Sequence, residues 1–214
     1  MKKILACLLL GVISQSGWAL DSADQQRLGS IQQSWAHIQY ETPEKQRAAA
    51  FEQLASQAST FTTERPSVAE AWIWKGIVTS SWAGAEGGLG ALGKAKQAKA
   101  DLEKSLTLDP KALQGSAYTS LAALYDRVPG WPIGFGDSDK AEQLLKQALQ
   151  LNPDGIDSLY FWGDHLFRQK RYAEAKAALT KALQAAPRPG RESADAGRRK
   201  EIASLLVDVN KKLE

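Results

Sequence analysis

The 214-residue sequence contains little cysteine or histidine and no long apolar run after its first twenty residues. Its only cysteine, Cys7, excludes an intramolecular disulfide and a cluster of cysteine metal ligands. Its only two histidines, His37 and His165, would need further ligands or a nearby nucleophile to form a metal or catalytic site. We therefore expect a fold stabilised by packing, with no metal and no other cofactor.

The first nineteen residues have the pattern of a bacterial secretory signal peptide. Two lysines precede an apolar run at 4–13, and small residues at Gly17 and Ala19 mark a cleavage site after Ala19. The run is too short for a membrane helix, so we expect a periplasmic protein whose mature chain begins near Leu20. Lipidation at Cys7 is the alternative, but this cysteine precedes most of the apolar run instead of following it.

Charge excludes one class of partner. The sequence has 27 basic and 24 acidic residues, and loss of the two lysines in the signal leaves 27 − 2 = 25 against 24, about +1. A nearly neutral chain is not typical of general nucleic-acid binders, which concentrate positive charge on one face. We expect neither a nucleic-acid partner nor a membrane span.

A repeating pattern of large and small apolar residues fills residues 156–187. These residues recur at helical spacing in two successive segments, and prolines at 153 and 187 are thirty-four residues apart. The recurring residues are Leu159, Trp162, Gly163, Leu166, Ala175, Leu179 and Ala182. Because two helices in close contact need a residue without bulk where they cross, we expect Gly163 to face Ala175 and Ala182.

This pattern resembles the tetratricopeptide repeat, a pair of antiparallel helices with a period of thirty-four residues. Trp162 and Gly163 match the large and small positions of its first helix, and Ala175 and Ala182 match the small positions of its second. The resemblance implies an all-α fold, a short right-handed superhelix of helix pairs. It also implies a concave groove, lined by the first helices, that receives a peptide or helix of another protein.

Two earlier units have the same pattern with extra residues between their helices. In the first unit Gly76 takes the small position, and in the second Ala122, Ala141 and Ala148 do. The extra residues lie at 83–93 and 127–137, at equivalent turns, so both inserts should emerge on one edge of the array. We assign three units to 67–190, an atypical helix pair to 20–66 and a C-terminal capping helix to 191–214. The capping helix has an apolar stripe suited to covering the last repeat.

The second insert, "RVPGWPIGFGD" at 127–137, is unusually apolar for a connector. Its prolines and glycines favour one specific folded path. We expect Trp131 and Phe135 to turn back and pack between the helices as a plug, and Asp137 to cap the next helix. The alternative is a lid that holds a ligand.

Catalytic and nucleotide-binding motifs are weak. Residues 88–94 have the spacing of a phosphate-binding loop, but Ala95 replaces the magnesium-binding serine or threonine and no strand precedes the loop. We expect a flexible glycine-rich insert there instead. Each histidine lies in a predicted helix, where packing or a hydrogen bond is its expected role. We therefore expect a protein that is not an enzyme.

The candidate binding residues are aromatic side chains and a cluster of arginines. By helical position the groove candidates are Trp74, Tyr118, Tyr125, Tyr160 and Phe161, joined by Trp131 and Phe135 of the insert. The arginines are Arg188, Arg191, Arg198 and Arg199, around the start of the last helix. They either converge on one anion or pair across the turn with Glu192 and Asp195.

The function that we expect is that of a non-catalytic periplasmic module that binds another protein or a peptide through the concave groove. The alternative is a small-ligand-binding accessory component of a periplasmic solute uptake system, with the two inserts as a lid. In that case an enclosed apolar cavity would lie beneath Trp131 and Phe135.

Overall fold

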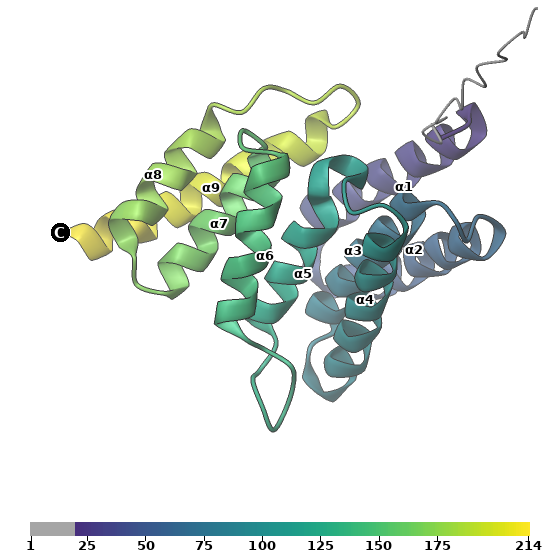
Figure 1. Cartoon of the computed structure of the whole chain (residues 1–214), viewed down its shortest axis with the longest axis horizontal. Coiled ribbons are helices and arrows are strands. Elements are labelled where there is room, and N and C mark those ends of the chain that lie inside the picture. The colour runs from purple at the N-terminus through teal and green to yellow at the C-terminus, as the bar shows by residue number, and fades with distance from the viewer. Residues whose placement is uncertain (1–19) are drawn as a thin grey trace, which may run out of the picture.

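The computed structural model describes residues 20–214, and the predicted signal peptide lies outside the described residues. All regular elements of 20–214 are helices, which confirms the predicted all-α fold (Figure 1). They are α1 (Ser22–Tyr40), α2 (Glu44–Glu64), α3 (Ala69–Glu86), α4 (Gly88–Leu108), the short 3-10 helix η1 (Ala112–Gly115), α5 (Ser116–Arg127), α6 (Ser138–Leu151), α7 (Ile156–Arg168), α8 (Tyr172–Leu183) and α9 (Glu192–Leu213).

A small residue in the first helix of a pair packs directly on a leucine of the second. A Cβ atom added to Gly163 of α7 would lie 2.6 Å from Cγ of Leu179 in α8. One added to Gly76 of α3 would lie 2.6 Å from Cγ of Leu102 in α4. Gly163 was predicted to face Ala175 and Ala182, but its nearest neighbour is Leu179. The backbone oxygen of Ala175 lies 3.5 Å from the added Cβ atom, and no atom of Ala182 is among the three nearest. Only a side chain without bulk allows these helices to approach so closely.

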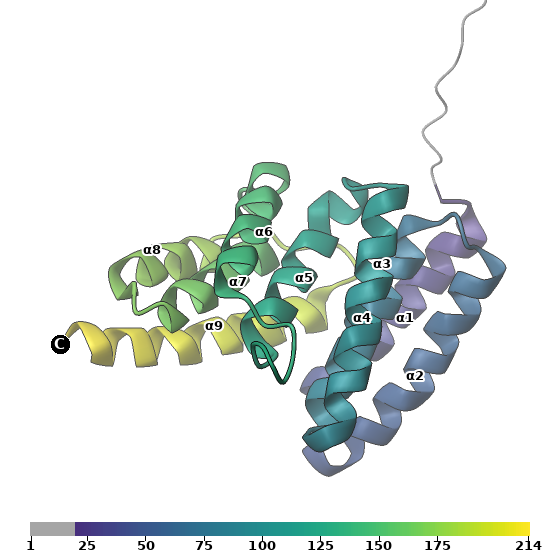
Figure 2. The same ribbon diagram turned by 60° about the horizontal axis from the view of Figure 1, so that its bottom comes forward.

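Helix α9 does more than cover the last repeat. Ile202 and Val209 are completely buried on its apolar stripe, where it packs against α7 and α8. Its N-terminal half also packs against α1, at the other end of the sequence (Figures 1 and 2). At this contact a Cβ on Gly197 would lie 2.3 Å from Cγ of Tyr40, whose hydroxyl donates a hydrogen bond to Glu201 at 3.3 Å. The capping helix therefore links the first helix of the chain to the last repeat.

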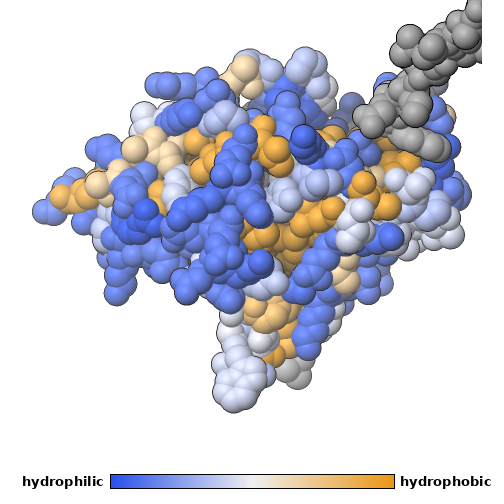
Figure 3. Space-filling model, in the orientation of Figure 1, coloured by the Kyte–Doolittle hydropathy of each residue, from blue (hydrophilic) through white to orange (hydrophobic). Residues whose placement is uncertain are grey.

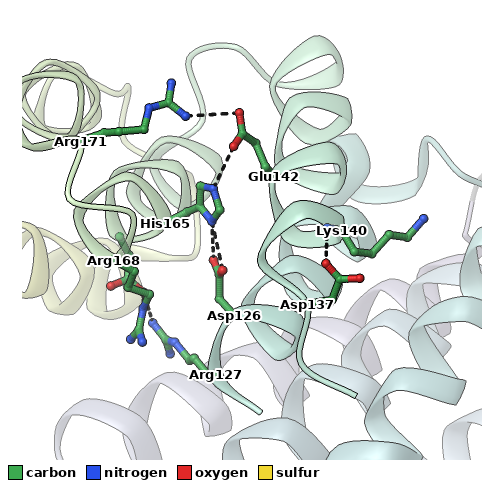
Figure 4. Close-up of polar contacts among 9 residues, drawn as sticks. Asp126, Arg127, Asp137, Lys140, Glu142, His165, Arg168 and Arg171 are labelled. Atoms are coloured by element: carbon green, nitrogen blue, oxygen red, sulfur yellow. Dashed lines mark hydrogen bonds and ion pairs between the residues drawn. The ribbon is translucent and has the colours of Figure 1, made fainter. Parts of the chain in front are cut away.

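A buried histidine joins the second and third repeats (Figure 4). His165 of α7 is 1% exposed, and its Nδ1 lies 3.0 Å from both carboxylate oxygens of Asp126 in α5, while its Nε2 lies 3.4 Å from Glu142 in α6. Burial alone would lower the pKa of His165, but the hydrogen bonds and negative charges of the two carboxylates raise it. The ring also stacks on Trp162, with centroids 5.6 Å apart. The other histidine, His37, is exposed and pairs with Glu41.

The insert at 83–93 is helical, which corrects the expected flexible glycine-rich loop. Its residues lengthen α3 and α4, and the chain turns at Gly87, where φ is 66°. A left-handed backbone angle of this kind favours glycine. Lys94, the lysine of the apparent phosphate-binding spacing, lies on α4, pairs with Glu86 and sits 4.3 Å from the ring centre of Trp82.

The insert at 127–137 has an ordered base. Gly136 donates a backbone hydrogen bond to Pro129 at 2.9 Å, and Asp137 donates one to Tyr125 at 3.0 Å. A Cβ on Gly136 would meet the Val128 carbonyl oxygen at 1.9 Å, so the path requires glycine there. The side chain of Asp137 caps α6 as expected, accepting a bond from its backbone.

The tip of this insert is not the predicted plug. Trp131 is 90% exposed and Ile133 is 69% exposed, and the tip projects beyond the rest of the surface (Figure 3). Phe135 alone packs back, with its ring 5.5 Å from that of Tyr125 in an edge-to-face arrangement. The prediction for Trp131 was wrong because apolar character alone does not bury a side chain: a short loop closed at its base by backbone bonds cannot turn every side chain inward.

The two aromatic residues of the insert should differ in their effect on stability. We expect Trp131→Ala to change the free energy of unfolding by less than about 0.5 kcal/mol, because the side chain is already in water. Phe135→Ala should cost roughly 1–2 kcal/mol, below the ~3–5 kcal/mol of a fully buried phenylalanine. Urea unfolding followed by circular dichroism measures both, and a larger loss for Trp131→Ala than for Phe135→Ala would contradict this assignment.

Candidate binding cavity

A cavity of about 930 Å³ lies between the first helices of the pairs and α9. Residues of α1, α3, α5 and α7 line one part of it, and α9 with the segment before it lines another. Both inserts border it at one edge, through Leu92 in α4 and Ile133 in the 127–137 insert. At this edge a Cβ on Gly134 would lie 3.4 Å from Leu92, so the two inserts are neighbours as expected.

Six aromatic side chains contribute to the cavity wall. Three of them, Trp74 of α3 and Tyr160 and Phe161 of α7, are predicted groove residues. The other three, Trp35 and Tyr40 of α1 and Phe51 of α2, were not predicted. The ring of Trp35 packs edge-to-face on both Trp74 and Tyr40, with centroids 5.9 and 5.8 Å apart. The signal for the two residues of α1 was present in the sequence, since α1 is also the first helix of a pair.

Four other candidates lie away from the cavity. Tyr118 and Tyr125 of α5 pack with the core between the helices, and Phe135 and the exposed Trp131 do not line the cavity either. The face of α5 toward the cavity carries small and polar side chains, among them Thr119, Ser120 and Ala123. The prediction of Tyr118 and Tyr125 as groove residues was therefore wrong, because the aromatic side chains of α5 lie on the face that is turned away from the cavity.

An ion-pair cluster centred on Asp157 forms the polar wall. Asp157, in the first turn of α7, accepts a bond from Arg188 at 2.7 Å and one from Arg198 of α9 at 2.7 Å. Arg188 also pairs with Asp195 at 2.6 Å, and Arg198 pairs with Glu201. Charge-assisted bonds of this kind are short and directional, so the cluster ties the start of α9 to the start of α7.

The cluster shifts the pKa of both kinds of group. Burial alone would raise the pKa of the Asp157 carboxyl, but Arg198 and Arg188 hold it well below its usual range. Burial would lower the pKa of the Arg198 guanidinium, but Asp157 and Glu201 raise it. Both shifts favour the charged forms of the two groups and therefore favour the ion pair between them.

The four predicted arginines divide into three kinds. Arg188 and Arg198 line the cavity and pair mainly with Asp157. Neither of the two predictions for these arginines, a bound anion or pairs with Glu192 and Asp195, included Asp157. Arg199 lies outside the cavity and donates bonds to the carbonyl oxygen of Leu183, the last residue of α8, and to that of Ala185, which follows the helix, at 2.7 Å. Arg191 lines the cavity and forms no ion pair with any residue of 20–214. Three of the four thus converge on the cavity.

Membrane spans and metal sites are both missing from the part of the chain that the structure describes. In 20–214 no helix is both long enough and apolar enough to cross a membrane. Over the same residues, no group of three or more histidine, cysteine or acidic side chains is arranged to hold a metal ion.

Comparisons with known proteins agree with this architecture. Residues 133–196 match a family model of the tetratricopeptide repeat, and residues 89–112 match a second model with the same description. A thermophilic TPR protein of Thermus thermophilus has a similar structure, with a TM-score of 0.57 and 19% sequence identity over 86% of this chain and 98% of that chain. No curated protein sequence matches the chain. Two segments of the chain, 89–112 and 133–196, thus match the tetratricopeptide repeat, and the chain resembles a TPR protein in its fold. Such repeats are typical of protein-interaction modules.

Removal of the Asp157 carboxylate should destabilise the protein, because Arg198 would keep its buried charge without its main partner. We expect Asp157→Asn to cost about 2–3 kcal/mol, less than the ~3–5 kcal/mol of a fully buried pair because Asp157 remains 34% exposed. The matched control is Asp154→Asn, which removes an exposed pair with Lys181 and should cost less than about 0.5 kcal/mol. Equal losses for the two variants in chemical denaturation would show that the Asp157 cluster does not anchor α9.

Proposed function

We propose that this chain is a non-catalytic periplasmic binding module that receives an extended peptide segment of another protein in the cavity. The cavity itself carries the proposal: about 930 Å³, bordered by the first helices of successive pairs. A pocket of roughly 300–1,000 Å³ accommodates a ligand of a few residues. Neither histidine lines it, which favours binding over catalysis.

The chemistry of the walls favours a particular kind of peptide. Trp35, Trp74 and Phe161 offer flat apolar surface, which suits large apolar side chains. The charged residues of the wall are Arg47, Arg127, Arg188, Arg191 and Arg198 against Glu44, Asp157 and Glu201, so 5 − 3 leaves a net charge of +2. A peptide that combines apolar and acidic residues complements both features.

The alternative of a small-ligand carrier with a lid has less support. In that hypothesis the cavity would lie beneath Trp131 and Phe135, but neither residue lines it. The inserts contribute to the edge of the cavity through other residues and leave Trp131 in solvent.

The periplasmic location rests on the pattern of residues 1–19. We expect mass spectrometry of the periplasmic fraction of a Gram-negative host to find a mature chain that begins at Leu20 or within a residue or two of it. An uncleaved chain in the cytoplasm, or a chain acylated at Cys7, would overturn the proposed location.

Crosslinking in the living cell tests the binding function. A photoreactive amino acid at Ser120, which lines the cavity, should give covalent adducts with a partner protein under ultraviolet light. The matched control is the same amino acid at Gln147, which is exposed on α6 and does not line the cavity. Adducts from Gln147 as abundant as those from Ser120, or none from Ser120, would contradict peptide binding in the cavity.

A further inference from the structure

Two neighbouring hydrogen-bond donors in the cavity wall lack an acceptor. The indole Nε1 of Trp74 and the Nε of Arg191 are both buried, and no acceptor within the described residues reaches either atom. The guanidinium carbon of Arg191 lies 5.0 Å from the centre of the Trp74 ring, so the two donors share one region. Buried polar groups without a partner are uncommon in folded proteins, because each has lost its bonds to water without gaining others.

Arg191 also differs from the arginines beside it in its charge balance. Arg188 and Arg198 are held by Asp157, and Arg188 has Asp195 as a second partner. Arg191 has no carboxylate within ion-pair distance in 20–214, while burial and the like charge of Arg188 lower its pKa. Folding therefore places in the cavity wall a positive charge that has no ion-pair partner and is offset only in part by the more distant Asp157 and Asp195. A ligand carboxylate would stabilise this charge further.

The surroundings of the pair define what would fit there. A carboxylate has two oxygens, each of which accepts hydrogen bonds, and the guanidinium edge of arginine matches it with two parallel donors. The indole N–H of Trp74 supplies a further donor. The ring of Trp35 packs on Trp74 from the side, so an apolar group next to the carboxylate would find an aromatic surface.

We propose that Arg191 and Trp74 form a subsite that binds a carboxylate of the peptide received by the cavity. This inference rests on the proposed function and deepens it. The carboxylate comes either from the C-terminus of the peptide or from an acidic side chain, and both would be recognised by the same donors. Arg191 is then retained for binding, since it makes no ion pair that stabilises the fold.

Short peptides in matched pairs test the subsite. The first pair is acetyl-Phe-Ala-Phe with a free C-terminal carboxylate and the same peptide amidated. The second pair is amidated acetyl-Phe-Glu-Phe and amidated acetyl-Phe-Gln-Phe. Binding is followed by the indole N–H resonance of Trp74 in ¹H–¹⁵N spectra, assigned with Trp74→Phe. We expect the acid of at least one pair to bind about tenfold more tightly than its amide, as for a charged hydrogen bond. The pair that shows this difference identifies the source of the carboxylate.

Two variants separate binding from a structural role. Arg191→Gln should abolish the preference for the acid and leave Tm unchanged or higher, because it removes a charge without a partner. Arg199→Gln is the matched control, since Arg199 lies outside the cavity, and it should keep the preference.

The contrary outcomes are distinct. Equal binding of acid and amide in both pairs would overturn the subsite while leaving peptide binding in the cavity intact. No binding of any peptide would also overturn it, and the crosslinking at Ser120 then decides the proposed function separately. A preference that survives Arg191→Gln, or a marked fall in its Tm, would show that Arg191 serves the fold and not the ligand.

Discussion

The ion pairs of Asp157 with Arg188 and Arg198 determine where α9 lies, and the cavity depends on that position. They join the first turn of α7 to the segment before α9 and to α9 itself. Held in this way, α9 extends across the repeats and packs against α1, with Gly197 allowing the close approach of Tyr40. An array of helix pairs that would otherwise have an open inner face thus acquires a wall opposite α3 and α5.

The helix pairs tolerate their inserts because the close contact lies away from the turn. In each repeat a small residue of the first helix is followed by a leucine of the second: Gly76 and Leu102, Ala122 and Leu145, Gly163 and Leu179. The separations are 26, 23 and 16 residues, so the first two exceed the third by 26 − 16 = 10 and 23 − 16 = 7 residues, which lie within the segments 83–93 and 127–137. The contact of Gly76 with Leu102 has the same form as that of Gly163 with Leu179. The extra residues extend the hairpins as helix at 83–93 and as a loop at 127–137.

Local patterns predicted the fold, whereas the cavity needed contacts that are remote in sequence. The small-and-large spacing around Gly163 lies within one helix pair, so the sequence predicts the pair. Trp74, Tyr160 and Phe161 follow from the expectation that first helices face inward. The bond between Tyr40 and Glu201 joins residues 161 positions apart, and no periodicity reports such a contact. The predicted burial of Trp131 was wrong for another reason. Hydropathy indicates which environment a side chain prefers, but not whether a short loop can turn it inward.

The arginine run shows most clearly what a sequence leaves undecided. Within twelve residues Arg188 and Arg198 anchor α9, Arg199 satisfies carbonyls at the end of α8, and Arg191 has no such task among the described residues. These four side chains are chemically identical, and their spacing does not distinguish them. Their roles differ because Asp157, 31 residues before Arg188 and 41 before Arg198, reaches only two of them. Arg188 and Arg198 are neutralised by carboxylates, whereas Arg191 lines the cavity without an ion pair, and this is the charge that the proposed ligand carboxylate would offset.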